Sequence, residues 1–222
     1  MSHNGALRDS LMALITEPYL RQVARWPTTG RHILAHYDDT SVVVYQAYRP
    51  NIGHFAATHG YFGGAFNLDR MSWIKPNFLW MMFRNEWGTK AHQDVTLAVR
   101  LKRAAFDGIL AAAVQSSFAP AIYKDDEEWG SALKRSSVVL QWDPDHAPSG
   151  RAVQRRAMQL GLRGAVLRSY AREWIVEIED TSPFVAEQRE HARSGRDERL
   201  ALPREDIYPV TDPIVAARLK LS

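Results

Sequence analysis

The chain has 222 residues, of which 45% are hydrophobic and 24% are charged, and its formal net charge at pH 7 is +3. This composition is that of an ordinary globular protein and excludes a disordered or collagen-like chain. Cysteine is absent, which excludes disulfides, thiolate metal sites and a cysteine nucleophile. The sequence has neither a run of about 18 apolar residues nor a signal-peptide pattern, so we expect a cytoplasmic protein that spans no membrane.

The first half of the chain predicts alternating short helices and strands. Apolar periodicity and turn residues place them, in chain order, as a helix over 6–16, strands over 33–36 and 41–48, a helix from 50 to 60, a strand over 70–74 and a helix over 77–84. Pro50 and Pro76 open the last two helices at positions that proline favours. Gly60 and Gly88 close the same two units.

The second half predicts a similar mixture. Strict apolar alternation over 94–102 is typical of a half-buried strand. The elements expected after it are a helix over 104–114, a helix start at 125–128, a strand over 137–142 ended by Asp143-Pro144, a helix over 165–171, a strand over 173–179 and a polar surface helix over 186–199.

The order of these elements predicts the fold class. Strands and helices alternate without the regular rhythm of a doubly wound sheet, so we expect an α+β fold: a single mixed domain with a central, largely antiparallel sheet flanked by helices. We expect this domain to span residues 31–200. Residues 1–30 are interpreted as an N-terminal extension, and residues 201–222 as an irregular C-terminal tail.

Two stretches are rich in cations. Residues 70–90 carry Arg70, Lys75, Arg84 and Lys90 within an otherwise apolar segment. Buried cations need partners. A bound phosphate, assisted by the amides of the helix that opens at Pro76, would supply one, and so would the acidic end of strand 173–179. Residues 151–172 contain six arginines and no acid, which indicates either an anion-binding surface or a solvated helix face.

Further candidates lie at strand ends. Strand 41–48 ends in the polar residues Gln46, Tyr48 and Arg49. We expect these side chains to face a cleft; the alternative is that they are ordinary exposed polar groups at a strand edge. Glu177 and Glu179 lie two apart on one strand face, where mutual repulsion predicts a raised pKa or a cationic partner; a solvent-facing strand is the alternative. The aromatic and methionine side chains of 80–83 are interpreted as core. The histidines show no ligand spacing, and no metal is expected.

Several segments together resemble a known family. They are 42–50, 70–82, 87–90, 137–144, 161–164 and 174–180. They resemble the family catalogued as domain of unknown function 4291, over roughly residues 31–190. The family name implies no activity.

The order of the motifs is also similar to that of the ADP-ribosyltransferase fold. Such proteins begin with a strand, a polar or aromatic triplet, a helix and a glycine, as here from Val44 to Gly60. Serine often stands on a second core strand, as Ser72 does, and a glutamate on a late strand. The usual first-motif histidine or arginine is replaced here by Gln46 or displaced to Arg49.

This likeness implies NAD-dependent ADP-ribosyl transfer, with NAD as cofactor. Glu179, or Glu177 in its place, would hold the ribose 2′-hydroxyl. Tyr48 or Trp73 would stack on nicotinamide. The pyrophosphate would be held by a cation; the candidates are Arg49, Arg70 and Lys75.

Two functional hypotheses follow, one for an enzyme and one for a binding protein. The first is a nucleotide-dependent enzyme that transfers ADP-ribose to a nucleic acid or another acceptor. The alternative is an RNA-binding or RNA-processing protein that does not use NAD. The enzyme hypothesis predicts one concave site, formed by Gln46, Tyr48, Arg70, Lys75 and Glu179. The binding hypothesis predicts an open basic surface. A purely structural protein would instead bury Arg70, Lys75 and Glu179 in mutual ion pairs with no pocket beside them.

Overall fold

The structure is a computed structural model that describes residues 14–222. It has the expected α+β architecture, in which antiparallel strand pairs predominate. Its helices are α1 (Tyr19–Val23), α2 (Pro50–His59), α3 (Phe78–Asn85), α4 (Arg103–Ala112), α5 (Asp126–Arg135), α6 (Gly164–Arg172), α7 (Ser182–Arg193) and α8 (Pro213–Leu219). Most of the helix expected over 6–16 lies outside the described residues.

The first sheet contains β3 (Ser41–Tyr48), β5 (Val95–Lys102) and β9 (Ile175–Asp180), in the order β3-β5-β9 and antiparallel throughout. The three strands confirm the sequence predictions for these segments. The prediction that β5 is half-buried is wrong, because even Thr96 and Arg100 are buried. Helices α2 and α4 contact the sheet from one side and α3 and α7 from the other, so each face lies against its own apolar cluster.

The second sheet contains β4 (Ser72–Ile74), β8 (Ala152–Leu162), β7 (Val138–His146) and β6 (Ala113–Gln115), in the order β4-β8-β7-β6. Strand β8 was not predicted. The prediction that Asp143-Pro144 ends the preceding strand is wrong, since β7 continues to His146 with a register shift after Pro144. Inside this extension the buried carboxylate of Asp145 accepts a 2.7 Å hydrogen bond from Nε of Arg155 on β8.

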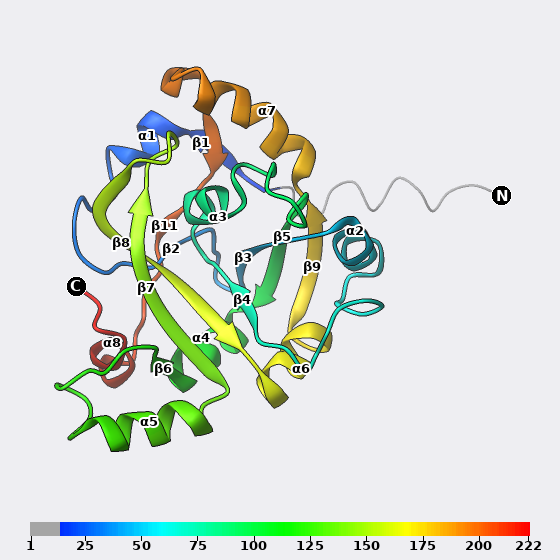
Figure 1. Cartoon of the computed structure of the whole chain (residues 1–222). Helices are drawn as coiled ribbons and strands as arrows, with labels where there is room; N and C mark the ends of the chain where they lie inside the picture. The colour runs from blue at the N-terminus through cyan, green and yellow to red at the C-terminus, as the bar shows by residue number, and fades with distance from the viewer. Residues whose placement is uncertain (1–13) are drawn as a thin grey trace.

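A backbone bridge joins the two sheets. The backbones of Tyr45 on β3 and Lys75, just after β4, exchange hydrogen bonds of 2.7 and 3.2 Å. In Figure 1, β5 and β9 lie on one side of the molecule, β7 and β8 lie on the other, and α3 lies between them. Asn77 caps the N-terminus of this helix, and its side chain accepts a hydrogen bond from the backbone N–H of Trp80.

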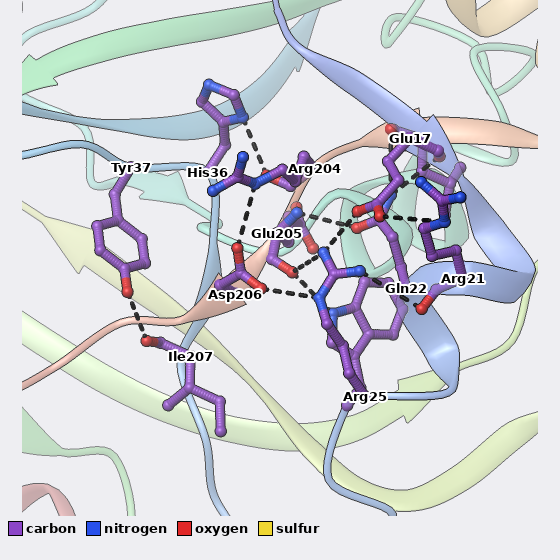
Figure 2. Close-up of polar contacts among 12 residues, drawn as sticks. Glu17, Arg21, Gln22, Arg25, His36, Tyr37, Arg204, Glu205, Asp206 and Ile207 are labelled. Carbon is purple, nitrogen blue, oxygen red and sulfur yellow. Dashed lines mark hydrogen bonds and ion pairs between the residues drawn. The ribbon is translucent and has the colours of Figure 1, made fainter.

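The segments at the two ends of the described chain bind each other. Strand β1 (Thr16–Pro18) pairs with β10 (Ala201–Pro203), and β11 (Asp206–Ile207) pairs with β2 (Leu34–Ala35). Figure 2 shows Gln22 and Arg25 of the N-terminal segment reaching Glu205 and Asp206.

The structure of these two end segments differs from the sequence prediction. Residues 14–30, part of the expected extension, bury Tyr19 and Trp26 against the core. Residues 201–222, expected to be irregular, form two short strands and α8. Polar and proline-rich sequence does not reveal this packing, because the apolar partners come from distant segments.

Candidate functional site

A cavity of about 790 Å³ lies where β3 and β4 separate beyond the Tyr45–Lys75 pair. All seven side chains predicted to hold a cofactor line it. They are Gln46, Tyr48, Arg49, Arg70, Ser72, Trp73 and Lys75. Helix α3 adds Trp80, Met81 and Arg84, and the second sheet adds Gln141, Asp143 and Gln159. The structure therefore brings together residues that are up to 113 positions apart in the chain (159 − 46).

A hydrogen-bond network fixes the end of the cavity at β3. The side-chain amide of Gln46 donates to the hydroxyls of Ser72 and Tyr48, at 2.8 and 2.7 Å, and to the Trp73 carbonyl. Its Oε1 accepts a 2.6 Å hydrogen bond from the Tyr170 hydroxyl. Burial raises the pKa of Tyr48, so its hydroxyl stays protonated at neutral pH. The network holds Gln46 in one orientation between the two sheets.

Lys75 is the most unusual side chain of the cavity. It is only 7% exposed, yet its ammonium group makes no hydrogen bond or ion pair with residues 14–222. Burial, and secondly the charge of Arg84, lower the pKa of Lys75 to about 8, while the Asp143 carboxylate opposes this shift. The side chain is buried while its Nζ opens onto the cavity, so an anion bound there would partly replace the hydration that burial removes.

Three arginines surround the same cavity. Arg49, Arg70 and Arg84 are exposed, and in the described part of the chain none of them pairs with a carboxylate. Arg84 lies 6.0 Å from the ring of Trp80. With Lys75 they make the cavity strongly positive, because Asp143 is the only acid among its lining residues.

The acidic group of the cavity is Asp143, which the sequence analysis missed. Its two carboxylate oxygens accept hydrogen bonds from the amides of Gln141, at 2.9 Å, and Gln159, at 2.8 Å. The sequence predicts that Asp143-Pro144 ends the strand over 137–142. The signal that was available is the alternation of Gln141 and Asp143, which places both on one face of a continuing strand.

The structure does not bring Glu177 and Glu179 to this cavity. They line a separate small hollow beside Arg100, whose Nε lies 3.9 Å from the Glu177 carboxylate. Burial, and secondly the charge of Glu177, raise the pKa of Glu179. In the sheet register Glu179 pairs with Ala98, Ala98 with Tyr45, and Tyr45 with Lys75. Three strand spacings, about 14 Å in all, therefore separate Glu179 from Lys75.

Part of the arginine-rich stretch 151–172 makes contacts within the fold. Arg155 forms a buried ion pair with Asp145. Arg163 donates to backbone carbonyls between residues 133 and 136. Arg172 lies 4.5 Å from the ring centroid of Tyr61. Arg155 and Arg163 are thus used within the fold, whereas Arg151, Arg168 and Arg172 are exposed.

The ion pairs proposed for a structural protein are also not found in the described region. Arg70 is exposed and lines the cavity, while Glu179 lies elsewhere. Among residues 14–222, no group of three or more His, Cys, Asp or Glu side chains is placed to hold a metal ion. Within the same residues, no helix has the length and apolarity needed to cross a membrane.

Comparison with known proteins gives a family but no activity. No curated protein matches this chain. The sequence model of a family described as a domain of unknown function, DUF4291, matches residues 32–208. That region contains every residue of the cavity. Because the match covers more than half of the chain, the protein belongs to the DUF4291 family.

Proposed function

We propose that this protein is an enzyme that acts on a phosphate-bearing nucleotide bound in the cavity between β3 and β4. The observation that carries the proposal is the unpartnered ammonium group of buried Lys75, surrounded by three arginines without ion pairs in the described chain. Phosphate oxygens are strong acceptors and pair well with guanidinium and ammonium groups. A phosphate would provide Lys75 with the partner that the described residues lack.

The dimensions and the walls of the cavity support a nucleotide over a free phosphate ion. Its volume of about 790 Å³ lies in the range of small-molecule sites. Trp73 and Trp80 line it, but the ring of Trp80 is buried and stacked on Phe83 and His146, so the partly exposed Trp73 is the ring that offers aromatic surface for a base. A ligand with both an aromatic ring and an anionic group uses both features.

The likeness to the ADP-ribosyltransferase fold suggests the reaction. The bond between nicotinamide and ribose would break, and nicotinamide would leave with the bonding electron pair. An acceptor oxygen or nitrogen would then bond to the ribose carbon and lose a proton. In this cavity only Asp143, among the described residues, offers a carboxylate to the developing cation. NAD is therefore the first nucleotide to test.

RNA binding without NAD is the alternative function. It predicts an affinity that falls steeply with salt, since many phosphates would be neutralised at an open surface. Two of the arginines in 151–172, Arg155 and Arg163, are used in contacts within the fold, which leaves the exposed Arg151, Arg168 and Arg172 as the cations that such a surface would use.

The test is calorimetric titration with NAD and with inorganic pyrophosphate. We expect saturable binding of NAD, weakened about tenfold or more by Lys75→Met, which removes a charge-assisted contact. Lys124→Met is the matched control, since the Lys124 side chain is 87% exposed and lies outside the cavity. No binding of either ligand, or equal binding by Lys75→Met and the wild type, would reject the proposal. An acceptor-labelling assay with NAD then tests transfer separately from binding.

A further inference from the structure

The cations of the cavity form two groups. Lys75 belongs to the first group and lies beside the floor of the cavity, where the second sheet contributes Gln141, Asp143 and Gln159. Arg84 belongs to the same group, because its charge acts on Lys75: burial, and secondly this charge, lower the pKa of the lysine. The nucleotide phosphate that Lys75 binds therefore lies at this end of the cavity.

The second group consists of Arg49 and Arg70, at the other end of β3. Strands β3 and β4 run antiparallel from the backbone bridge that joins the two sheets, and further along a contact of 2.6 Å joins the hydroxyls of Tyr48 and Ser72. Arg49 directly follows Tyr48, and Arg70 comes two residues before Ser72. Four residues of extended chain, about 13 Å, separate Arg49 from the bridge. Neither arginine is among the charges that shift the pKa of Lys75.

A nucleotide phosphate at the floor leaves this second group without an anion. Arg49 and Arg70 line the cavity, are exposed, and form no ion pair with residues 14–222. The acid of the cavity, Asp143, acts on Lys75 and so belongs to the first group. The two phosphates of a pyrophosphate share an oxygen atom and are too close together to occupy both ends. The second group therefore suits a phosphate of another molecule.

The second group continues onto the surface of α6. The segment 61–70, which ends at Arg70, packs along this helix: Asp69 accepts a 3.0 Å hydrogen bond from Arg168, and the ring centroid of Tyr61 lies 4.5 Å from the guanidinium of Arg172. Arg168 and Arg172 are exposed and lie one helical turn apart on the same face. Cations and an aromatic ring thus form a strip that leads from the cavity along α6.

Single-stranded nucleic acid is the partner whose chemistry matches this strip. It carries a phosphate at every nucleotide, and its bases stack on aromatic side chains. The acids of the strip are Asp69 and Glu173. The ion pair between Asp69 and Arg168 is exposed on both sides. Exposed pairs contribute little, so a phosphate can replace this carboxylate.

We propose that Arg49 and Arg70 form a second anion subsite, which binds a phosphate of a single-stranded nucleic acid while Lys75 holds the nucleotide. The strand is then the acceptor of the ADP-ribosyl group. An oxygen or nitrogen of the strand bonds to the ribose carbon, nicotinamide leaves with the bonding electron pair, and a proton passes from the acceptor atom to water. This inference rests on the proposed function and adds to it the class of acceptor.

The first experiment measures whether the two ligands bind together. A short fluorescent oligouridylate is titrated with the full chain by fluorescence anisotropy, with and without saturating NAD. We expect the strand to bind with similar affinity in both cases. Competition with NAD would show one shared subsite and overturn the inference. A phosphoserine peptide of the same net charge is titrated in parallel, and equal affinity for the peptide would overturn nucleic acid as the partner.

The second experiment compares variants at the two ends of the cavity. Arg70→Gln should weaken strand binding about tenfold, lower the slope of log affinity against log salt by about 0.7, the value for one phosphate of a single strand, and affect NAD less. Lys75→Met should show the reverse preference. Arg168→Gln, outside the cavity, should weaken binding of the strand and not of NAD. Arg135→Gln is the matched control, since Arg135 is exposed at the end of α5 and lies outside the cavity.

The outcomes separate this inference from the proposed function. If neither ligand binds, or if the strand alone binds, the proposed function fails and the inference fails with it. If NAD binds and the strand does not, the second subsite is overturned while the nucleotide site stands. The same holds if Arg70→Gln weakens NAD binding as much as Lys75→Met does and leaves strand binding unchanged.

Discussion

Lys75 illustrates how one buried side chain connects stability with binding. A lysine inside the protein loses the hydration of its charge, and here no described residue compensates for it with an ion pair. Its pKa falls to about 8, against about 10.5 in the unfolded chain. Because the unfolded chain binds the proton of Lys75 more tightly than the folded protein does, the lysine lowers the free energy of unfolding at every pH below about 10.5. A bound anion reverses this cost.

We therefore predict that Lys75→Met is more stable than the wild type at pH 7. Below pH 8 the folded wild type pays for the buried charge, and a pKa difference of this size corresponds to roughly 3 kcal/mol. Between pH 8 and pH 10.5 the unfolded wild-type chain binds more protons, so the free energy of unfolding of the wild type rises and approaches that of the variant. Urea denaturation of both proteins at pH 7 and pH 9.5 measures this difference. A constant difference across the two pH values would contradict it.

Anion binding should show the opposite dependence on pH. Inorganic sulfate keeps a constant charge from pH 7 to pH 9.5 and imitates phosphate. Its affinity for the wild type should fall as the pH rises through about 8, because Lys75 becomes neutral. Lys75→Met should bind sulfate weakly at every pH. Displacement titrations at fixed ionic strength test this, and an affinity of the wild type that does not change with pH would count against Lys75 as the anion ligand.

At the scale of the elements, strand β8 supports the cavity through the absence of one side chain. A methyl group at Gly161 would lie 2.6 Å from Met71 Sδ and 3.1 Å from the ring of Trp73. Both of those residues line the cavity. A glycine on β8 therefore allows β4 and the segment before it to lie close to the floor.

Gly161→Ala should displace Trp73 and weaken nucleotide binding about tenfold, at a cost of about 1–3 kcal/mol in the free energy of unfolding. Gly108→Ala is the control, since a methyl group there meets no atom within 4 Å and Gly108 lies inside α4. That substitution should stabilise the protein by about 0.5–1 kcal/mol. Calorimetry and urea denaturation on the same preparations distinguish the two effects. Unchanged binding by Gly161→Ala would show that Trp73 does not contact the ligand.

The elements also show where local sequence is sufficient. Strand β3 and helix α2 were predicted with nearly their observed bounds. The run of β-branched and aromatic residues that forms the strand stops before Pro50, which begins the helix, and Gly60 ends the helix. Strand β8 was missed because its arginines and glutamines resemble a solvated surface. Pairing with β4 on one side and β7 on the other makes it a strand.

At the scale of the whole molecule, the region outside the family match completes the fold. Trp26 is buried, donates its indole N–H to the Glu205 carbonyl at 2.8 Å, and lies 5.2 Å from the guanidinium of Arg155. The family match begins only at residue 32. An N-terminal segment of this chain thus packs on the matched region and joins its C-terminal strands to the second sheet.

We predict that Trp26→Ala lowers the free energy of unfolding by about 3–5 kcal/mol, the cost of removing a large buried aromatic side chain. Leu20→Ala is the control, because Leu20 in the same segment is 49% exposed and its loss should cost less than about 1 kcal/mol. Equal effects of the two substitutions would mean that residues 14–30 contribute little to the stability of the core.

The sequence by itself determined the fold class, the approximate bounds of the central strands and helices, and seven residues that line the cavity. Local propensity, proline and glycine positions and strand-end polarity are properties of neighbouring residues, so they can be recognised along the chain. Only the tertiary structure decided which acid joins those residues. Asp143 reaches the cavity, and Glu179 does not, because strand order and register place them in different parts of the molecule. Register depends on pairing between distant segments, which no short stretch of sequence contains.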